Sequence, residues 1–145
     1  MKRHADLVQL SREHHAALKL ALHARRAAES GDADEIRKLA GRVVEFFADE
    51  LDAHFRIEEQ GILVALEQGG EDAPVRRTLD EHHELRTLVS ALAHPNATTL
   101  WRFADLLASH VRYEERELFP LAEAVLVPGI VTMIEIDLQA KGAQA

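Results

Sequence analysis

Hydrophobic residues recur every three or four positions along most of the chain, and this spacing predicts amphipathic α-helices. The pattern is interrupted at three short stretches rich in Gly, Pro, Asp and Asn. Between these interruptions we expect four helices, over about residues 6–29, 33–68, 74–93 and 98–126. Residues 127–145 are apolar enough to form a short helical tail that covers one end of the fold or meets a second subunit.

Local signals at the expected helix ends support this division. Asp32 can cap the second helix, Pro74 suits the first turn of the third, and Thr98 or Thr99 can cap the fourth. The connections are short, so successive helices should be antiparallel neighbours. The predicted fold is therefore all-α, an up-down-up-down antiparallel four-helix bundle, with residues 1–145 as a single domain.

Two sequence motifs each occur twice. Residues 47–59 and 103–115 are identical at eight of thirteen positions, and they fall in the second and fourth predicted helices. A shorter motif, Arg-Glu-His-His at 12–15 and Asp-Glu-His-His at 80–83, falls in the first and third helices. The chain therefore uses one helix pair twice, and a pseudo-two-fold axis should relate the two copies.

The longer motif places a histidine four residues before a glutamate, at His54 and Glu58 and again at His110 and Glu114. Residues four apart share one helix face, so an imidazole and a carboxylate can bind the same cation. Both pairs lie on apolar stripes, where two buried carboxylates facing each other would repel. A divalent cation between them removes this cost, since each glutamate can bridge two metal ions. The charged neighbours expected to point away from the core are Arg56, Glu59, Arg112 and Glu115.

Each shorter motif contains two histidines, of which one is expected to face inward. Of the six residues three, four and seven positions from His14, five are apolar, against three of six for His15. The same comparison gives four of six for His82 and one of six for His83. His14 and His82 should therefore face the core. His15 and His83 lie on the flank, where they either contact the inward residues or are solvated.

Six inward polar residues result, with one or two from every helix. They are His14, His54, Glu58, His82, His110 and Glu114. Four imidazoles and two bridging carboxylates suit a pair of iron ions, cycling between Fe2+ and Fe3+, and are also compatible with manganese. The alternative is a bundle whose buried histidines only hydrogen-bond to one another, which would leave six costly polar groups in a small core without a role.

Composition narrows the chemistry further. The 145 residues include no cysteine, so any metal must be held by histidine and carboxylate. The formal net charge of −8 argues against nucleic acid as a partner. No apolar run approaches the roughly 20 residues of a membrane span, and the N-terminus lacks the apolar segment of a secretory signal. We therefore expect a cytoplasmic protein without membrane contact.

The order His … His-x-x-x-Glu … His … His-x-x-x-Glu resembles the hemerythrin-like, or HHE cation-binding, family over about residues 7–124. The resemblance implies a carboxylate-bridged di-iron centre in an up-down bundle, with the six inward residues at its ligand positions and Glu58 and Glu114 as the bridges. Oxygen-carrying hemerythrins differ in having a fifth histidine one turn from the third-helix ligand, where this chain has Thr78 and Arg86. They also commonly have aspartate where Glu114 lies. One iron is then short of a protein ligand, which argues against reversible oxygen storage of the same kind.

The predicted function is that of a non-haem di-iron protein that binds oxygen, nitric oxide or a related small ligand as a sensor, store or scavenger. A di-iron enzyme that decomposes peroxide and an iron storage or handling protein are the alternatives. No phosphate loop or general base accompanies the ligand motifs, so catalysis on an organic substrate is not expected. Expected partners are a small diatomic ligand or a peroxide, together with a second copy of the chain, as a homodimer, or a redox or signalling protein.

Overall fold

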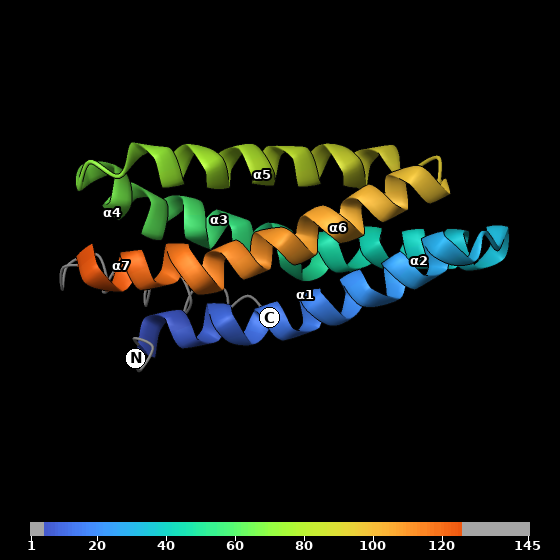
Figure 1. Cartoon of the computed structure of the whole chain (residues 1–145), viewed down its shortest axis with the longest axis horizontal. Helices are drawn as coiled ribbons and strands as arrows, with labels where there is room; N and C mark the ends of the chain where they lie inside the picture. Colours follow the sequence, from blue (N-terminus) through green and yellow to red (C-terminus); the bar gives the residue numbers. More distant parts are fainter. Residues whose placement is uncertain (1–4, 126–145) are drawn as a thin grey trace.

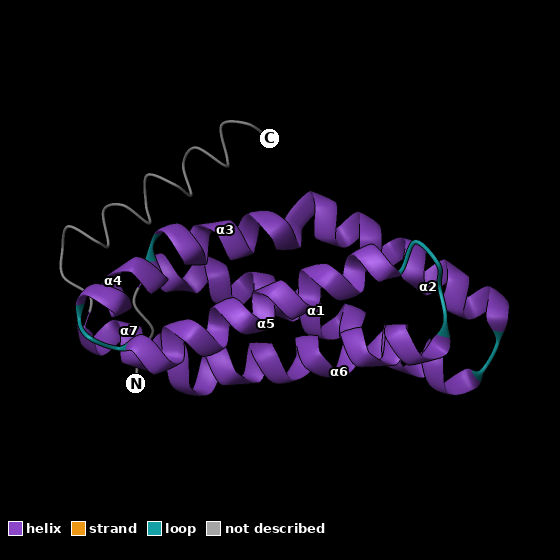
Figure 2. Cartoon of the chain, turned by 90° about the horizontal axis from the view of Figure 1, so that it is seen from above, coloured by secondary structure: helices purple, strands orange, loops and turns teal. Residues whose placement is uncertain are grey.

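The computed structural model describes residues 5–125, and every regular element in this part of the chain is helical. The elements form four rods, each antiparallel to the next (Figures 1 and 2). This confirms the predicted all-α bundle; the predicted tail over residues 127–145 lies outside the described residues. The first rod is α1 (Ala5–Ser30); the second is α2 (Ala33–Phe46), η1 (Phe47–Leu51), α3 (Asp52–Gln60) and α4 (Ile62–Gln68); the third is α5 (Asp72–Ala91); the fourth is α6 (Ala97–Tyr113), η2 (Glu114–Leu118) and α7 (Phe119–Val125).

Most of the turns between rods follow the sequence signals. The Asp32 carboxylate accepts hydrogen bonds from the backbone N–H groups of Asp34 and Glu35, so its predicted role as the cap of α2 is confirmed. Gly31 and Gly70 have φ angles of 70° and 84°, in the left-handed region that favours glycine. These two glycines let the chain reverse direction after the first and second rods.

The predicted cap of the fourth rod at Thr98 or Thr99 is wrong. The cap is Asn96, whose side-chain oxygen accepts a hydrogen bond from the backbone N–H of Thr99 at 2.8 Å. Asn96 has the extended backbone that a cap residue requires, whereas both threonines already lie in the first turn of α6. Pro74 does lie in the first turn of α5, which begins at Asp72.

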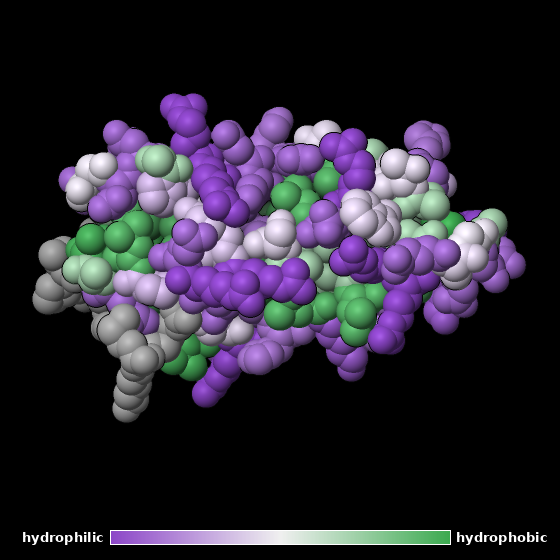
Figure 3. All heavy atoms as spheres, in the orientation of Figure 1, coloured by the Kyte–Doolittle hydropathy of each residue, from purple (hydrophilic) through white to green (hydrophobic). Residues whose placement is uncertain are grey.

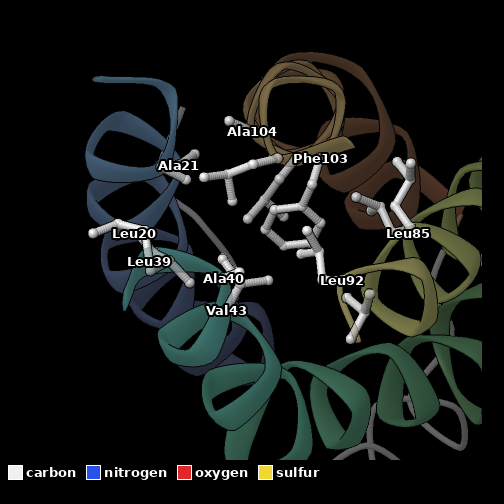
Figure 4. Packing of buried hydrophobic residues seen from close by; sticks show 14 of the residues in the cluster. Leu20, Ala21, Leu39, Ala40, Val43, Leu85, Leu92, Phe103 and Ala104 are labelled. Atoms are coloured by element: carbon white, nitrogen blue, oxygen red, sulfur yellow. The ribbon is translucent and has the colours of Figure 1, made fainter. Parts of the chain in front are cut away.

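The apolar core consists of two clusters that follow each other along the bundle. One lies toward the α1–α2 and α5–α6 connections and includes Leu39, Val43 and Phe103 (Figure 4). The other lies toward the α4–α5 connection and includes Leu66 and Phe119. Each large side chain buried in these clusters contributes roughly 1.5–3 kcal/mol to folding. The clusters therefore form a stable scaffold on both sides of the polar residues between them.

Two turns of π-helix interrupt the second and fourth rods, and they are not at equivalent places in the sequence repeat. In the second rod the π turn is η1, Phe47–Leu51, one turn before His54. The corresponding stretch of the fourth rod, residues 103–107, is regular α-helix, and its π turn, η2, begins only at Glu114. The sequence repeat is therefore not an exact structural repeat. Such π turns within α-helices frequently occur at functional sites.

The surface shown in Figure 3 is largely hydrophilic, with scattered hydrophobic positions. No helix within residues 5–125 is long and apolar enough to cross a membrane. Among the described residues, the large hydrophobic side chains that are exposed lie apart in the sequence, and they are Leu22, Val44, Leu79 and Trp101.

Candidate metal centre

The structure brings the six predicted inward residues together between the two apolar clusters. All six are buried, with exposed fractions of 4% or less. His15 and His83 are exposed, so the prediction that the first histidine of each doublet faces the core is confirmed. The six come from all four rods: His14 from α1, His54 and Glu58 from α3, His82 from α5, His110 from α6 and Glu114 from the start of η2.

One group of ligand atoms, half-site A, consists of the Nε2 atoms of His14 and His54 with one carboxylate oxygen each from Glu58 and Glu114. His14 Nε2 lies 2.8 Å from Glu114 Oε1, and His54 Nε2 lies 3.2 Å from Glu58 Oε2. His54 Nε2 is also 3.9 Å from Glu114 Oε1. These residues can each place one ligand atom within 4.8 Å of the others, so a single cation among them could contact all four.

The second group, half-site B, consists of the Nε2 atoms of His82 and His110 with the other oxygens of Glu58 and Glu114. His82 Nε2 lies 3.1 Å from Glu58 Oε1, and His110 Nε2 lies 3.3 Å from Glu114 Oε2. Each glutamate therefore directs one oxygen toward each half-site. This is the arrangement that two cations bridged by two carboxylates would require.

Within the described part of the chain, six buried side-chain atoms have no hydrogen-bond partner, and all six belong to the two half-sites. They are His54 Nε2, Glu58 Oε1, Glu58 Oε2, His82 Nε2, His110 Nε2 and Glu114 Oε2. A buried polar atom left unpaired costs about 1–3 kcal/mol. Two cations would provide every one of these atoms with a partner, and a set of imidazole and carboxylate donors suits iron or manganese. The residues present therefore fit a pair of metal ions.

A family model of the hemerythrin HHE cation-binding domain matches residues 6–122. The chain belongs to this family. Comparisons with curated proteins and with solved structures gave no significant match. The family assignment agrees with the geometry, because the domain is one that binds metal cations and its buried histidines and glutamates are grouped so that they can hold them.

Four further glutamates, which we call the outer glutamates, contact the histidines of this hemerythrin-like centre from the side away from the half-sites. Each accepts a hydrogen bond from the Nδ1–H group of one histidine. The pairs are His14 with Glu115 (2.7 Å), His54 with Glu13 (2.8 Å), His82 with Glu59 (2.7 Å) and His110 with Glu81 (2.7 Å). All four outer glutamates are partly exposed, so they separate the buried histidines from solvent.

Glu59 and Glu115 lie off the core-facing stripe, as expected, but they still contact the histidines of the site from its outer side. Each directly follows Glu58 or Glu114 in sequence and is rotated by about 100° around the helix from it. That rotation directs the side chain along the flank of the rod, where the Nδ1 atom of a histidine from the neighbouring rod lies. One sequence signal could have revealed this role, because all four motif copies carry a glutamate directly beside a predicted ligand.

The outer glutamates decide which nitrogen of each imidazole can bind a cation. A carboxylate can only accept a hydrogen bond, so Nδ1 of each histidine must carry the proton. The lone pair of a neutral imidazole is then on Nε2, which is the atom that faces the half-sites. Histidine ligands of metals commonly have such a partner, which fixes both the tautomer and the orientation of the ring.

The electrostatics of the centre are dominated by burial and by the carboxylates of Glu58 and Glu114. Burial by itself lowers the pKa of His110, but the nearby Glu114, together with Glu81 and Glu58, outweighs it and raises that pKa to about 10. Burial alone would raise the pKa of Glu114, yet the surrounding histidines hold it well below its usual value. Without metal, the carboxylates are therefore balanced by protonated imidazoles. A cation that binds must displace these protons.

The two positions one turn from His82, where oxygen-carrying hemerythrins would have their fifth histidine, are occupied here by residues with other contacts. Thr78, one turn before His82, is fully buried, and its hydroxyl donates a hydrogen bond to the Pro74 carbonyl at 2.9 Å. Arg86, one turn after His82, binds Glu59 and Asp52. The two half-sites therefore have matching donor sets of two imidazoles and two carboxylate oxygens.

The surroundings of the two half-sites differ in access. A cavity of about 230 Å³ lies between α1 and the η1 turn, and both histidines of half-site A line it, as does Leu51 of η1. A phenylalanine ring stacks on one histidine of each half-site, more closely in half-site B: Phe55 lies 3.9 Å from His82 and Phe119 lies 5.3 Å from His14 between ring centroids. The residues that line the cavity are Gln9, Arg12, Glu13, His14, Ala16, Ala17, Phe46, Glu50, Leu51 and His54.

Proposed function

We propose that the domain holds two iron ions, one in each half-site, and that the pair binds a small diatomic ligand such as oxygen or nitric oxide, or a peroxide. The observation that carries the proposal is that Glu58 and Glu114 each direct one oxygen toward each half-site. Two carboxylates so placed would repel each other in a dry core unless cations or protons lay between them. Manganese is compatible with the same donors.

The bound iron pair would supply two metal ions that can each change oxidation state by one electron. The residues of the chain would hold the ions at a fixed separation, orient the imidazoles and exclude bulk water. Four protein donors at each ion leave coordination positions that a small ligand can occupy. The cavity beside His14 and His54 supports access of such a ligand to half-site A.

The roles of sensor, store and scavenger all need this ligand binding, and iron handling is the less favoured alternative. A protein that carries iron as cargo must release it readily. Here all six proposed ligands are buried and four are held by outer glutamates, which favours a resident metal centre. The partners expected from the sequence, a second copy of the chain or a redox or signalling protein, stay predictions.

The experiment begins with metal analysis of the full chain after anaerobic reconstitution with ferrous iron. We expect close to two iron ions per chain, and an absorption spectrum of the reduced protein that changes when air or nitric oxide is admitted. The matched control is His83→Ala, which alters an exposed histidine and should leave both results unchanged. A reconstituted wild-type chain without bound iron would contradict the proposal.

A further inference from the structure

The outer glutamates form a closed ring around the bundle. Each lies directly beside a proposed ligand on its own rod, and each holds a histidine of the next rod. Glu13 of α1 binds His54 of α3, and Glu59 of α3 binds His82 of α5. The ring then continues from Glu81 of α5 to His110 of α6, and closes from Glu115 of η2 to His14 of α1. All four rods are thus linked through the histidines.

A carboxylate at Nδ1 does more than orient an imidazole. Its negative charge polarises the Nδ1–H bond and makes Nε2 a stronger donor to a metal ion. It also lies close enough to the centre to favour the more highly charged oxidation state of a bound metal. Removing one outer glutamate should therefore weaken metal binding and also raise the reduction potential.

Both outer glutamates of half-site B are in turn bound by an arginine. The Arg86 guanidinium donates to both oxygens of Glu59, at 2.9 and 3.3 Å, and to Asp52 at 3.3 Å. Arg77 donates to Glu81 at 3.3 Å, and its guanidinium lies 3.7 Å from the centroid of the Tyr113 ring. Each guanidinium offsets part of the negative charge that its glutamate presents to the histidine. It should therefore reduce the effect of that glutamate on metal binding and on the reduction potential.

The outer glutamate of His14 has a hydroxyl contact of a different kind. The Ser11 hydroxyl donates to Glu115 Oε2 at 2.8 Å, and the same oxygen accepts from His14. This hydroxyl therefore helps to orient the Glu115 carboxylate toward His14.

We propose that Glu13, Glu59, Glu81 and Glu115 are positioning residues that hold the ligand histidines, and that Arg77 and Arg86 set the charge on the glutamates of half-site B. This inference rests on the metal centre proposed above. It assigns a role to six charged residues that the ligand pattern of the family does not include.

The test compares two substitutions that should shift the reduction potential in opposite directions, one at Glu59 and one at Arg86, which binds it. Glu59→Gln should weaken metal retention against a chelator by about 10–100-fold, and it should raise the reduction potential because one negative charge is lost. Arg86→Gln should lower the potential, because the charge of Glu59 is no longer offset. A purely structural role for these residues would not produce shifts of opposite sign. Circular dichroism of the metal-free variants checks that each folds.

The matched controls are Glu84→Gln and Arg102→Gln, which break an exposed ion pair, 3.3 Å long, that does not touch the ligand histidines. Neither should change metal retention or potential. If Glu59→Gln and Arg86→Gln both showed the metal retention and the reduction potential of the wild type, this inference would be overturned but the proposed function would not. A wild-type chain that retained no metal would instead overturn the proposed function, and the inference with it.

Discussion

Half-sites A and B have the same donors but different surroundings. In half-site A, the histidines line a cavity of about 230 Å³. In half-site B, Phe55 stacks on His82, the Arg86 guanidinium lies 5.5 Å from the Phe55 ring, and Arg86 also binds Glu59. The sequence repeat therefore accounts for the matching ligands. Positions at which the two copies differ, such as Phe55 against Val111, and residues outside the motifs, such as Arg86, give the half-sites different surroundings.

The difference arises partly from the backbone. Residues 47–49 and 103–105 are both Phe-Ala-Asp, yet only the first stretch forms a π turn. Phe103 is fully buried in the core, whereas its counterpart in the π turn, Phe47, is only partly buried, and Leu51 at the end of that turn lines the cavity. One widened turn thus lies next to half-site A.

Substitution of Glu58 or Glu114 should have the largest effect, because each of them directs one oxygen toward each half-site. Glu58→Ala or Glu114→Ala should abolish retention of both metal ions and lower the melting temperature. Each substitution leaves the Nε2 atoms of imidazoles in the core without a partner, at about 1–3 kcal/mol for each unpaired atom. It also removes the stabilisation that metal binding gives to the folded state. Metal analysis and thermal melts with and without a chelator measure both effects.

The control for this pair is Glu84→Ala, since Glu84 is a half-exposed glutamate that contacts Arg102. Glu59 and Glu115 would be poor controls, because they hold His82 and His14. Loss of metal in the Glu84 variant, or full retention in the Glu58 variant, would rule out the bridging role.

Loss of one histidine should affect mainly one half-site. His82→Ala removes a donor of half-site B and should reduce iron from about two ions toward one, whereas His83→Ala should retain both. His14→Ala and His15→Ala make the same comparison for half-site A. Metal content of the four variants, measured after dialysis, reports the difference. Equal losses within either doublet would contradict the assignment of the ligands.

The sequence predicts the fold and the inward residues well because both depend on regular helix periodicity. Leu10, His14 and Ala17 follow one face of α1, and all three are buried. The cap at Asn96 was missed because threonine and asparagine compete for the same role, and the choice depends on where the helix begins. The π turn at Phe47–Leu51 has no local sequence signal, because the same tripeptide, Phe-Ala-Asp, forms regular α-helix at residues 103–105 of α6.

The ring of outer glutamates shows a different limit of the sequence. Periodicity places Glu59 and Glu115 correctly off the inward face, but it does not show which atom of the neighbouring rod each will meet. That contact depends on how the rods pack side by side. The short distances between each outer glutamate and its histidine are therefore a result of tertiary structure.

The stability of the metal-free protein should depend on pH through the protonated imidazoles. The pKa of His110 is raised to about 10 in the folded protein, from 6.5 in an unfolded chain. The resulting stability is fully present below pH 6.5 and is lost as the pH rises toward about 10. On the acid side, the lowered pKa of Glu114 gives stability that is present above pH 4.5 and is lost as the pH falls below that value.

Thermal melts of the metal-free chain should therefore show the highest melting temperature between about pH 4.5 and 6.5. Ferrous iron, added anaerobically, should reverse the alkaline slope, because it binds the deprotonated imidazoles. In His110→Gln the alkaline loss should be smaller. A metal-free wild type that grew more stable from pH 7 to 9 would contradict this account of the charges.

A substitution that narrows the access to half-site A should have the smallest effect, because it should change only the rate at which a small ligand associates. Ala16 is exposed and lines the cavity, so Ala16→Phe should narrow the approach to His14 and His54 without altering the donors. We expect two bound iron ions, an unchanged melting temperature, and association of nitric oxide or azide that is several-fold slower in stopped-flow absorption. The matched control is Ala91→Phe, at an exposed alanine near the end of α5 that does not line this cavity. If both variants bound the ligand at the wild-type rate, entry would have to follow another route, and the contrast in access between the half-sites would lose its support. If only the Ala16 variant were slow, the cavity beside the π turn would be the route by which small ligands reach the centre.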